Sequence, residues 1–187
     1  RLTVLRPAAY HQNLAGQAHD GMLRVPYSLD APFTNVDLTD VAEVAADAEV
    51  VAEASRDWWP LAMTWALDGQ VAARAGAVAR PESADEVAAV LRVCNDARVP
   101  VTAAAGRSGV CGASVPLHGG VGLDLCALSG IFDVDDESLV LDVLPGTFGT
   151  WLEDTLRAEH GATLGHWPQS IDLSTVGGWL ACRSAGQ

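Results

Sequence analysis

A glycine-rich segment in the middle of the chain has the composition of an anion-binding loop. It reads AAAGRSGVCGAS over residues 103–114, here called the glycine loop, with Gly106, Gly109 and Gly112 at every third position. Glycines leave successive backbone N–H groups free to point at an anion, with no side chain in the way. Arg107 and Ser108 could add a charge or a hydroxyl donor. Because the spacing differs from the G-x-G-x-x-G fingerprint, an ordinary surface turn remains the alternative.

A second candidate closes the chain as GHWPQSIDLSTVGGWLACRSAGQ, residues 165–187. A helix is predicted to begin at Ser174-Thr175, with Asp172 or Ser174 as its cap. A helix start offers unpaired N–H groups and a positive dipole end, both of which favour an anion. Gly177 and Gly178 follow at once, although each glycine costs about 1 kcal/mol relative to alanine inside a helix. A ligand against the bare backbone would explain them, and so would close helix–strand packing.

Two anion-binding loops on one chain suggest a long ligand with a central pyrophosphate. His166 lies beside the second loop, either as a helper at the site or as a histidine that packs in the loop. No G-x-S-x-G motif occurs, and no histidines are paired at metal-ligand spacing. The basic residues are all arginines, which excludes a phosphate-binding or Schiff-base lysine in this segment.

The cysteines and the net charge exclude further classes of protein. Cysteines 94, 111, 126 and 182 show no C-x-x-C or zinc spacing, so we expect no metal and interpret them as small buried residues of a reduced, cytoplasmic protein. The formal net charge of −13, without a basic cluster, argues against nucleic acid and anionic membrane surfaces. No apolar run is long enough for an integral membrane segment. A small-molecule substrate is the expected partner, and a homodimer is left open.

The elements that must position these loops divide the chain after residue 75. Residues 1–75 are predicted to form a mainly helical extension, in which Asp37–Arg56 carries apolar residues at helical spacing. Trp58, Trp59 and Trp65 follow around a proline. They form either a hydrophobic anchor packed on the next domain or an aromatic wall facing a substrate.

Residues 76–187 alternate strand and helix patterns and predict an α+β domain. A strand before Pro81, a helix with a Ser83–Glu86 capping box and a strand over 99–106 form a β-α-β unit, which favours a parallel pair. A third strand begins at Val121, and a hairpin turns near Asp135-Asp136. The next helix is predicted to start with a capping box of Thr150 and Glu153 and to stop at Gly161.

Several of these motifs together resemble a known family. TAAAGRSGVCG, VGLDL and the stretch from VLPGTFG to RSAGQ are similar to the FAD-binding domain of the vanillyl-alcohol-oxidase and p-cresol-methylhydroxylase superfamily. The ending resembles most the alkylglycerone-phosphate synthase branch, and GASVPLHGGVGLDL is similar to glycolate and D-lactate dehydrogenases. The resemblance covers residues 76–187 and implies a p-cresol-methylhydroxylase-type FAD-binding domain, incomplete at its carboxyl end.

By this resemblance, four groups of residues would contact FAD. The first pyrophosphate loop would be Thr102, Ala103, Ala104, Ala105, Gly106, Arg107 and Ser108. The second would be Gln169, Ser170, Ile171, Asp172, Leu173, Ser174 and Thr175. A further contact would come from Cys182, Arg183, Ser184 and Ala185, while Gly177 and Gly178 would let the helix backbone approach the cofactor.

The chain departs from the family pattern at three places. Ala104 and Ala105 stand where the synthase branch has glycines, and Cys182 replaces the usual threonine. Cys111 falls where covalent members place a flavin-linking histidine, so the resemblance implies non-covalent FAD. Family members continue into a substrate cap domain that carries most of the acid–base residues, so no catalytic residue is named.

Three functions remain open at this stage. The first is the FAD-binding portion of an oxidoreductase that oxidises a 2-hydroxy acid or an alcohol. The second is a synthase-like transferase acting on an alkyl-glycerone-phosphate. The third is an acidic interaction module without a cofactor, in which the glycine loops are mere turns.

Overall fold

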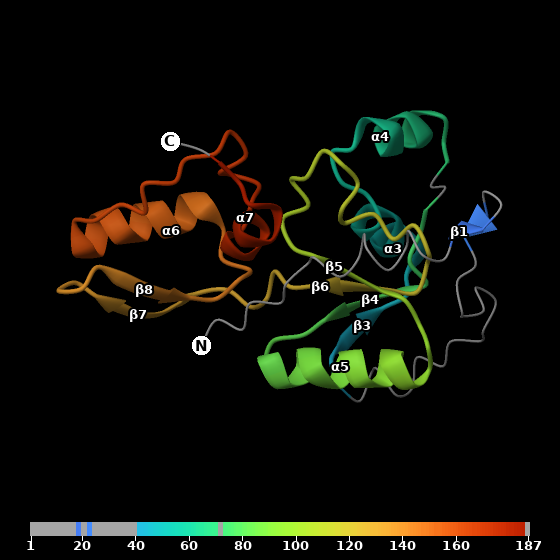
Figure 1. Ribbon diagram of the computed structural model, residues 1–187, viewed down its shortest axis with the longest axis horizontal. Coiled ribbons are helices and arrows are strands. Elements are labelled where there is room, and N and C mark those ends of the chain that lie inside the picture. Colours follow the sequence, from blue (N-terminus) through green and yellow to red (C-terminus); the bar gives the residue numbers. More distant parts are fainter. Residues whose placement is uncertain (1–17, 20–21, 24–40, 71–72, 186–187) are drawn as a thin grey trace.

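A computed structural model describes residues 18–19, 22–23, 41–70 and 73–185 of the chain. Figure 1 shows two lobes side by side. The larger lobe holds a four-stranded sheet in the order β3-β4-β6-β5, and the smaller lobe holds the hairpin of β7 and β8. Two further short strands, β1 (Ala18–His19) and β2 (Met22–Leu23), pair with each other. In the described ranges no helix is both long and apolar enough to cross a membrane.

The sheet of the larger lobe is built around a strand that the β-α-β prediction did not place. Strands β4 (Ala77–Arg80) and β5 (Val101–Ala104) are parallel, as expected, but both pair with β6 (Val121–Asp124), which lies between them. The predicted direct pair is therefore wrong. The apolar side chains of β6 explain its place, because a central parallel strand is covered on both faces. Val121 is completely buried, and Leu123 nearly so.

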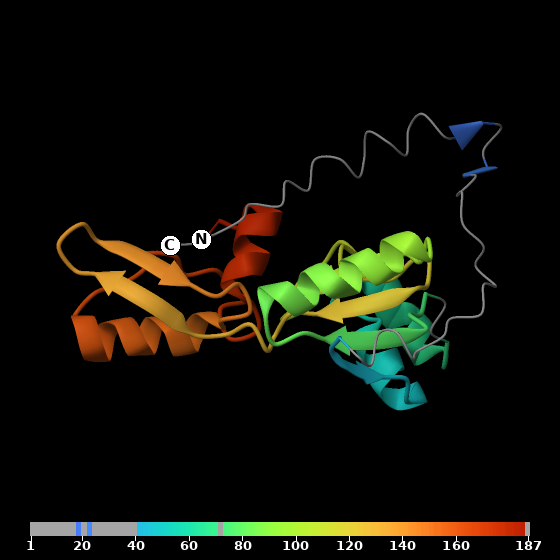
Figure 2. The same cartoon turned by 90° about the horizontal axis from the view of Figure 1, so that it is seen from below.

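Helices cover both faces of this sheet (Figure 2). On one face, α5 (Ala84–Asp96) packs Val90 and Cys94 against the sheet. The Ser83 hydroxyl caps α5 by accepting from the Glu86 amide at 3.2 Å, as predicted. The reciprocal half of the box differs, because the Glu86 carboxylate accepts from the amide of Glu82. On the other face, α3 (Ala48–Ala54) packs through Val51.

The helix predicted over Asp37–Arg56 is wrong in its first described part. Glu43–Ala45 form strand β3, which pairs antiparallel with β4, and α3 begins only at Ala48. The Asp47 carboxylate caps α3 by accepting from the amides of Glu49 and Val50 at 2.9 and 3.2 Å. The open edge of β4 offers β3 a full set of backbone partners, which outweighs the helical spacing of its side chains. Residues 37–40 lie outside the described residues, and β3 carries the sheet across the predicted boundary after residue 75.

The smaller lobe confirms the predicted hairpin and helix but not the helix cap. Strands β7 (Ile131–Asp135) and β8 (Val140–Val143) pair antiparallel around a turn at 136–139, and α6 (Gly149–Thr155) packs on them. A π-helical turn, η1 (Leu156–His160), continues α6 and stops at Gly161 with φ 60°, as predicted. The predicted capping box is wrong, since Phe148 is the N-cap residue and Thr150 lies inside the helix.

Glu153, the other residue of that box, is buried in the smaller lobe. Its carboxylate accepts from the Thr163 hydroxyl, from Arg157 Nε at 2.8 Å and from the Leu164 amide at 3.1 Å. Burial alone would raise the pKa of Glu153, but these bonds and the charge of Arg157 outweigh it and lower the pKa. Glu153 thus ties the loop after η1 to the helix.

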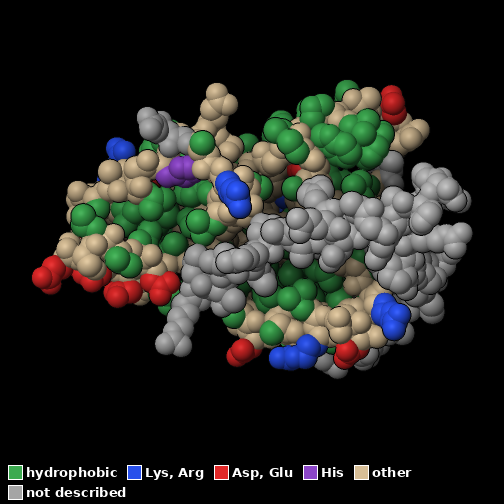
Figure 3. Space-filling model, in the orientation of Figure 1, with side chains coloured by type: hydrophobic (Ala, Val, Ile, Leu, Met, Phe, Trp, Pro, Cys, Tyr) green, Lys and Arg blue, Asp and Glu red, His purple; other side chains and the backbone are tan. Residues whose placement is uncertain are grey.

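The tryptophans pack as the predicted anchor at two of three positions. The Trp59 and Trp65 rings meet edge to face at 5.6 Å, and both pack against the cluster of Ala62, Ala73 and Val115. Trp58 is half exposed. It lies just before the N-cap residue of α4 (Pro60–Leu67), over which hydrophobic side chains gather in Figure 3.

The cysteines are free, as expected, but only Cys94 is buried, and Cys126 is partly buried. Cys94 is buried, and desolvation raises the pKa of its thiol to about 11. Cys111 and Cys182 are exposed, contrary to the prediction, because they lie on the glycine loop and on the open side of the last helix.

Candidate functional site

The glycine loop and the second loop, residues 169–175, meet in the structure although they are far apart in the sequence. Their contact is between Gly106 and the backbone of Leu173. A Cβ at residue 106 would overlap the Leu173 carbonyl oxygen and lie 3.0 Å from its carbon. It would also lie 3.3 Å from the Phe148 ring. The two predicted pyrophosphate loops are therefore neighbours, and only glycine fits at the point of contact.

The glycine loop presents a run of backbone amides without a partner in the part of the chain that the structure describes. Among the described residues, the N–H groups of residues 106–111 donate to no carbonyl or side chain. Within this run, the backbone of Arg107 adopts the left-handed conformation, with φ 51°. Successive amides around a left-handed residue form a concave nest for an anion. This is the geometry predicted for a phosphate loop.

The Arg107 side chain, which was predicted to add a charge to that loop, bonds to three groups of the protein itself. Its guanidinium donates to Asp124 Oδ2 at 3.0 Å, to the Ala54 carbonyl at 3.2 Å and to the Ala105 carbonyl at 3.3 Å. Burial alone would raise the pKa of Asp124, but the Cys126 amide and Arg107 hold it below its usual value. Because the pair is largely buried, Arg107 fixes the loop from beneath.

The second loop differs from the prediction in how its amides are used. Helix α7 (Val176–Cys182) begins after Thr175, whose hydroxyl accepts from the Gly178 amide at 3.4 Å. The Val176 amide donates to the Thr147 carbonyl, and the Gly177 amide donates to the Pro145 carbonyl. The helix start therefore does not offer the open N–H groups that the sequence suggested, since neighbouring carbonyls fill them.

The predicted caps Asp172 and Ser174 have other partners. Asp172 accepts from the Thr150 hydroxyl. Ser174 is buried, accepts from Trp179 Nε1 at 2.6 Å and donates to the Ser170 carbonyl at 2.7 Å. These side chains shape the second loop, and Thr175 is the cap instead.

The two glycines of α7 have different surroundings. A Cβ on Gly177 would lie 2.7 Å from Pro145 Cβ and 2.9 Å from its carbonyl oxygen, so close packing explains this glycine. Among the described residues, a Cβ on Gly178 would meet only the Thr175 hydroxyl, at 3.4 Å. Packing inside the chain therefore accounts for Gly177 and leaves Gly178 as the position where a ligand would explain a bare backbone.

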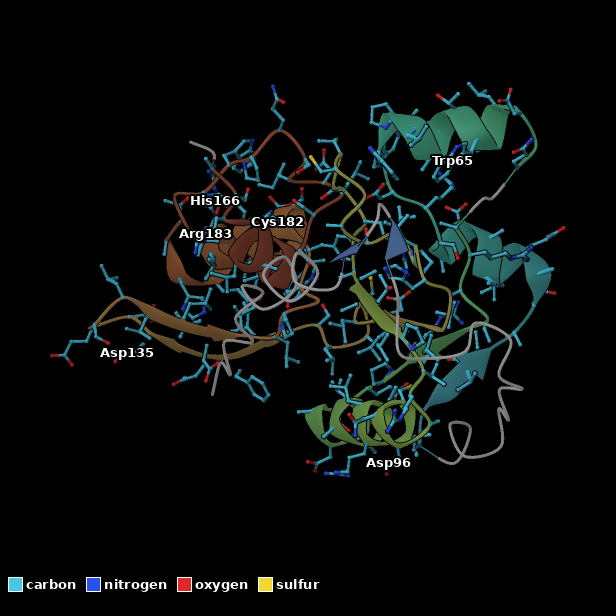
Figure 4. All side chains as sticks on the ribbon, turned by 45° about the vertical axis from the view of Figure 1, so that its right-hand side comes forward. Trp65, Asp96, Asp135, His166, Cys182 and Arg183 are labelled. Atoms are coloured by element: carbon cyan, nitrogen blue, oxygen red, sulfur yellow. The ribbon has the colours of Figure 1, made fainter. Side chains whose placement is uncertain are left out.

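The remaining predicted contacts lie around α7. Arg183 ends the helix in the left-handed conformation, with φ 51°, and its side chain is exposed. The Ser184 amide donates to the Trp179 carbonyl at 2.9 Å. In Figure 4, Arg183, Cys182 and His166 lie together, apart from Trp65 on α4.

His166 packs its ring on Trp179 at 4.8 Å. Its Nε2 is buried and has no partner among the described residues. This contact supports the loop-packing interpretation, while the orphaned nitrogen leaves the helper role open.

The other predicted residues divide between strand, core and surface. Thr102, Ala103 and Ala104 belong to β5 and pair with β6, so the first loop proper begins at Ala105. The Ile171 side chain lies in the core of the smaller lobe, whereas Gln169, Leu173 and Ala185 are exposed. Within the described ranges, no three His, Cys, Asp or Glu side chains gather as a metal site.

Sequence reasoning missed one residue beside the glycine loop. Asp57 is 4% exposed, and its carboxylate lies within hydrogen-bond distance of Ser114 on the loop. The only signal in the sequence was an acidic residue directly before two tryptophans.

Comparison with known proteins places this site in a family context. Residues 75–187 match the family model described as "FAD binding domain". The glycolate oxidase subunit GlcD of Bacillus subtilis is 31% identical over 112 residues, which are 59% of this chain and 23% of that protein. A D-lactate dehydrogenase of Anaerostipes hadrus is 33% identical over 115 residues, 58% of this chain and 24% of that protein. The chain thus spans about a quarter of the length of these relatives.

Solved structures agree with the predicted fold. An alkyldihydroxyacetonephosphate synthase superposes with a TM-score of 0.72 at 25% identity, covering 84% of this chain and 29% of that one. A p-cresol methylhydroxylase superposes with a TM-score of 0.64 at 16% identity, covering 77% of this chain and 28% of that one. The predicted p-cresol-methylhydroxylase-type fold is confirmed.

Proposed function

Since residues 75–187 belong to the FAD-binding domain family, we propose that this chain is the cofactor-binding portion of a flavin-dependent oxidoreductase whose substrate is a 2-hydroxy acid or an alcohol. The observation that carries the proposal is the nest of unpaired amides at residues 106–111, which lies against the second loop at Gly106 and Leu173. The hydroxy-acid substrate class rests on the similarity to a glycolate oxidase subunit and a D-lactate dehydrogenase.

The residues present fit FAD. A pyrophosphate needs several N–H donors within a short concave stretch, and residues 106–111 provide them with no partner to displace among the described residues. Arg107 keeps these amides in place through Asp124 instead of touching the ligand itself. Gly178 has no side chain that would keep a ligand away from the backbone of α7. The exposed Arg183 supplies a positive charge at the end of that helix.

Each residue of the site then has a defined task. Bound FAD supplies the redox chemistry, while the protein binds and orients it. The glycine loop holds the pyrophosphate, Gly106 keeps the two loops in contact, and Thr175 stabilises the start of α7. Cys111 stands exposed on the loop, and we propose that it makes no bond to the flavin. We assign no residue of this chain to acid–base catalysis.

A synthase-like transferase is the second candidate. The alkyldihydroxyacetonephosphate synthase structure covers 84% of this chain, which is more than the segment matched by the family model. The similarity therefore extends into the part before residue 75. The p-cresol methylhydroxylase structure, which covers 77% of this chain, shares that extension, so the alkyl-glycerone-phosphate candidate rests on the higher TM-score of the synthase structure, 0.72 against 0.64.

The test uses the purified full-length protein. A yellow preparation with a flavin absorption spectrum would support FAD binding, and a colourless preparation that takes up no added FAD would overturn it. Anaerobic bleaching of the flavin by glycolate or D-lactate would support the oxidoreductase. Exchange of an acyl chain for a fatty alcohol on acyl-glycerone-phosphate, without bleaching by hydroxy acids, would replace it with the transferase.

A further inference from the structure

The segment that joins α3 to α4 runs along the glycine loop although it precedes the part of the chain matched by the family model. We call residues 54–59 the clamp segment. At one end, the Ala54 carbonyl accepts from Arg107 Nε at 3.2 Å. Further along the segment, the Trp58 amide donates to the Gly109 carbonyl at 3.0 Å. The clamp segment thus follows the loop for several residues.

Asp57 adds a side-chain contact between the clamp segment and the glycine loop. Its Oδ1 accepts from the Trp59 amide at 2.8 Å, and its Oδ2 accepts from the Ser114 hydroxyl at 3.4 Å. A buried carboxylate is costly unless it is hydrogen-bonded, so both bonds constrain its position. The carboxylate also borders Gly109, where a Cβ would lie 3.6 Å from Oδ2.

Trp59 closes the other end of the clamp segment. Its ring lies against Gly112, where a Cβ would come within 2.8 Å of the indole. Gly112 has φ 75°, a conformation that favours glycine. The Asp57 carboxylate accepts a hydrogen bond from the Trp59 amide, so it also orients the segment that carries this ring.

These contacts solve a physical problem that the free amides create. A loop whose N–H groups are kept for a ligand cannot hold itself in place through those groups. It must be held through its carbonyls, side chains and Cα surface, and the contacts of Arg107, Gly109, Gly112 and Ser114 supply all three kinds. Fixing a residue costs conformational entropy, so a loop that is ordered beforehand binds its ligand more tightly.

We propose that Asp57 is a positioning residue that holds the glycine loop in its cofactor-binding conformation before FAD arrives. The inference rests on the proposed binding of FAD at this loop. Asp57 acts through Ser114 and the Trp59 amide and does not touch the cofactor.

The test compares Asp57→Ala and Asp57→Asn with Asp47→Ala in the full-length protein. Asp47 is a matched control, because its carboxylate also accepts backbone amides but caps α3 away from the loop. Asp57→Ala should raise the FAD dissociation constant at least tenfold at a temperature well below melting. Asp57→Asn keeps an oxygen acceptor and should recover part of the affinity, while Asp47→Ala should bind like the wild type.

A second measurement needs no flavin. In the FAD-free protein, trypsin cleavage after Arg107 should be at least tenfold faster in Asp57→Ala than in wild type and Asp47→Ala, because the loop is released. Wild-type cleavage and affinity in Asp57→Ala would overturn the proposal, as would equal losses in Asp47→Ala or faster cleavage with unchanged affinity. A wild-type protein that binds no FAD would refute the proposed function, and the cleavage rates would still show whether Asp57 holds the loop.

Discussion

Gly106 lies directly against the carbonyl group of Leu173, so closely that a Cβ at residue 106 would overlap the carbonyl oxygen. Gly106→Ala should therefore push the two loops apart and lower the free energy of unfolding by about 1–3 kcal/mol, as overpacked substitutions do. FAD affinity should fall with it. Gly109→Ala is the matched control, since its Cβ meets only Asp57, at 3.6 Å. Equal melting temperatures for the two variants, measured by calorimetry, would contradict the packing argument.

The two glycines of α7 should respond in opposite ways. Gly177→Ala forces a methyl group onto Pro145 and should destabilise the FAD-free protein. In the described part of the chain, the methyl group of Gly178→Ala meets only the Thr175 hydroxyl, so this change should leave that protein as stable, or up to about 1 kcal/mol more stable. If the cofactor lies against this backbone, Gly178→Ala should also weaken FAD binding at least about tenfold, or 1.4 kcal/mol. Normal affinity in Gly178→Ala would remove Gly178 from the site.

Arg183 combines an unfavourable backbone conformation with an exposed charge. Glycine adopts the left-handed conformation more readily, so Arg183→Gly should stabilise the FAD-free protein by about 1 kcal/mol. If the guanidinium binds the cofactor, the same change should weaken FAD binding by about 1.5–3 kcal/mol. Arg183→Lys keeps the charge and should lose less affinity. An unchanged dissociation constant in Arg183→Gly would return Arg183 to the role of a surface charge.

Acid should destabilise the protein through Glu153 and Asp124. Both have lowered pKa values in the folded state, against ordinary values of about 4.3 and 3.9. Their contribution is therefore fully present above about pH 5 and is lost as pH falls through the lowered values.

Glu153→Gln tests this pH dependence. The variant should lose about 1–3 kcal/mol at pH 7, and its difference from the wild type should shrink below about pH 4. Glu159→Gln, an exposed change on the same helical segment, should follow the wild-type profile. A Glu153→Gln difference that stays constant from pH 7 to pH 3, by thermal melts, would refute the assignment.

The flavin should be bound without a covalent link. Cys111 is free and exposed at the position where the resemblance places a linking histidine in covalent members. Acid precipitation should therefore release the flavin into the supernatant. Flavin fluorescence that stays with the denatured protein band on a gel would show a covalent bond.

Local chemistry made several parts of the molecule predictable from the sequence. The Ser83 cap of α5, the stop at Gly161 and the turn after Asp135 follow from hydrogen bonds and backbone angles within a few residues. Because these interactions are local, their residues determine them wherever the segment lies. The glycine loop was predictable for the same reason, since its bare amides belong to its own composition.

The tertiary structure decided which partners these segments bond to. The helical spacing over Asp37–Arg56 gave way to β3 because an open edge of β4 was available, which no local pattern reveals. The amides at the start of α7 donate to the carbonyls of Thr147 and Pro145, which belong to a turn distant in the sequence. Arg107 forms an ion pair with Asp124, which the local sequence does not reveal either, since charge pairs form between residues that folding brings together.

The sequence by itself therefore determined that this chain carries a glycine loop with the composition of an anion site, because glycines free the backbone amides wherever they stand. Only the tertiary structure decided that, among the described residues, the amides of the glycine loop stay without partners while those at the start of α7 are bonded. It also decided that the second loop packs against the glycine loop. Contacts over long sequence separations, such as those of Gly106 with Leu173 and of Asp57 with Ser114, made that choice. They depend on the packing of whole elements, which one segment's residues do not specify.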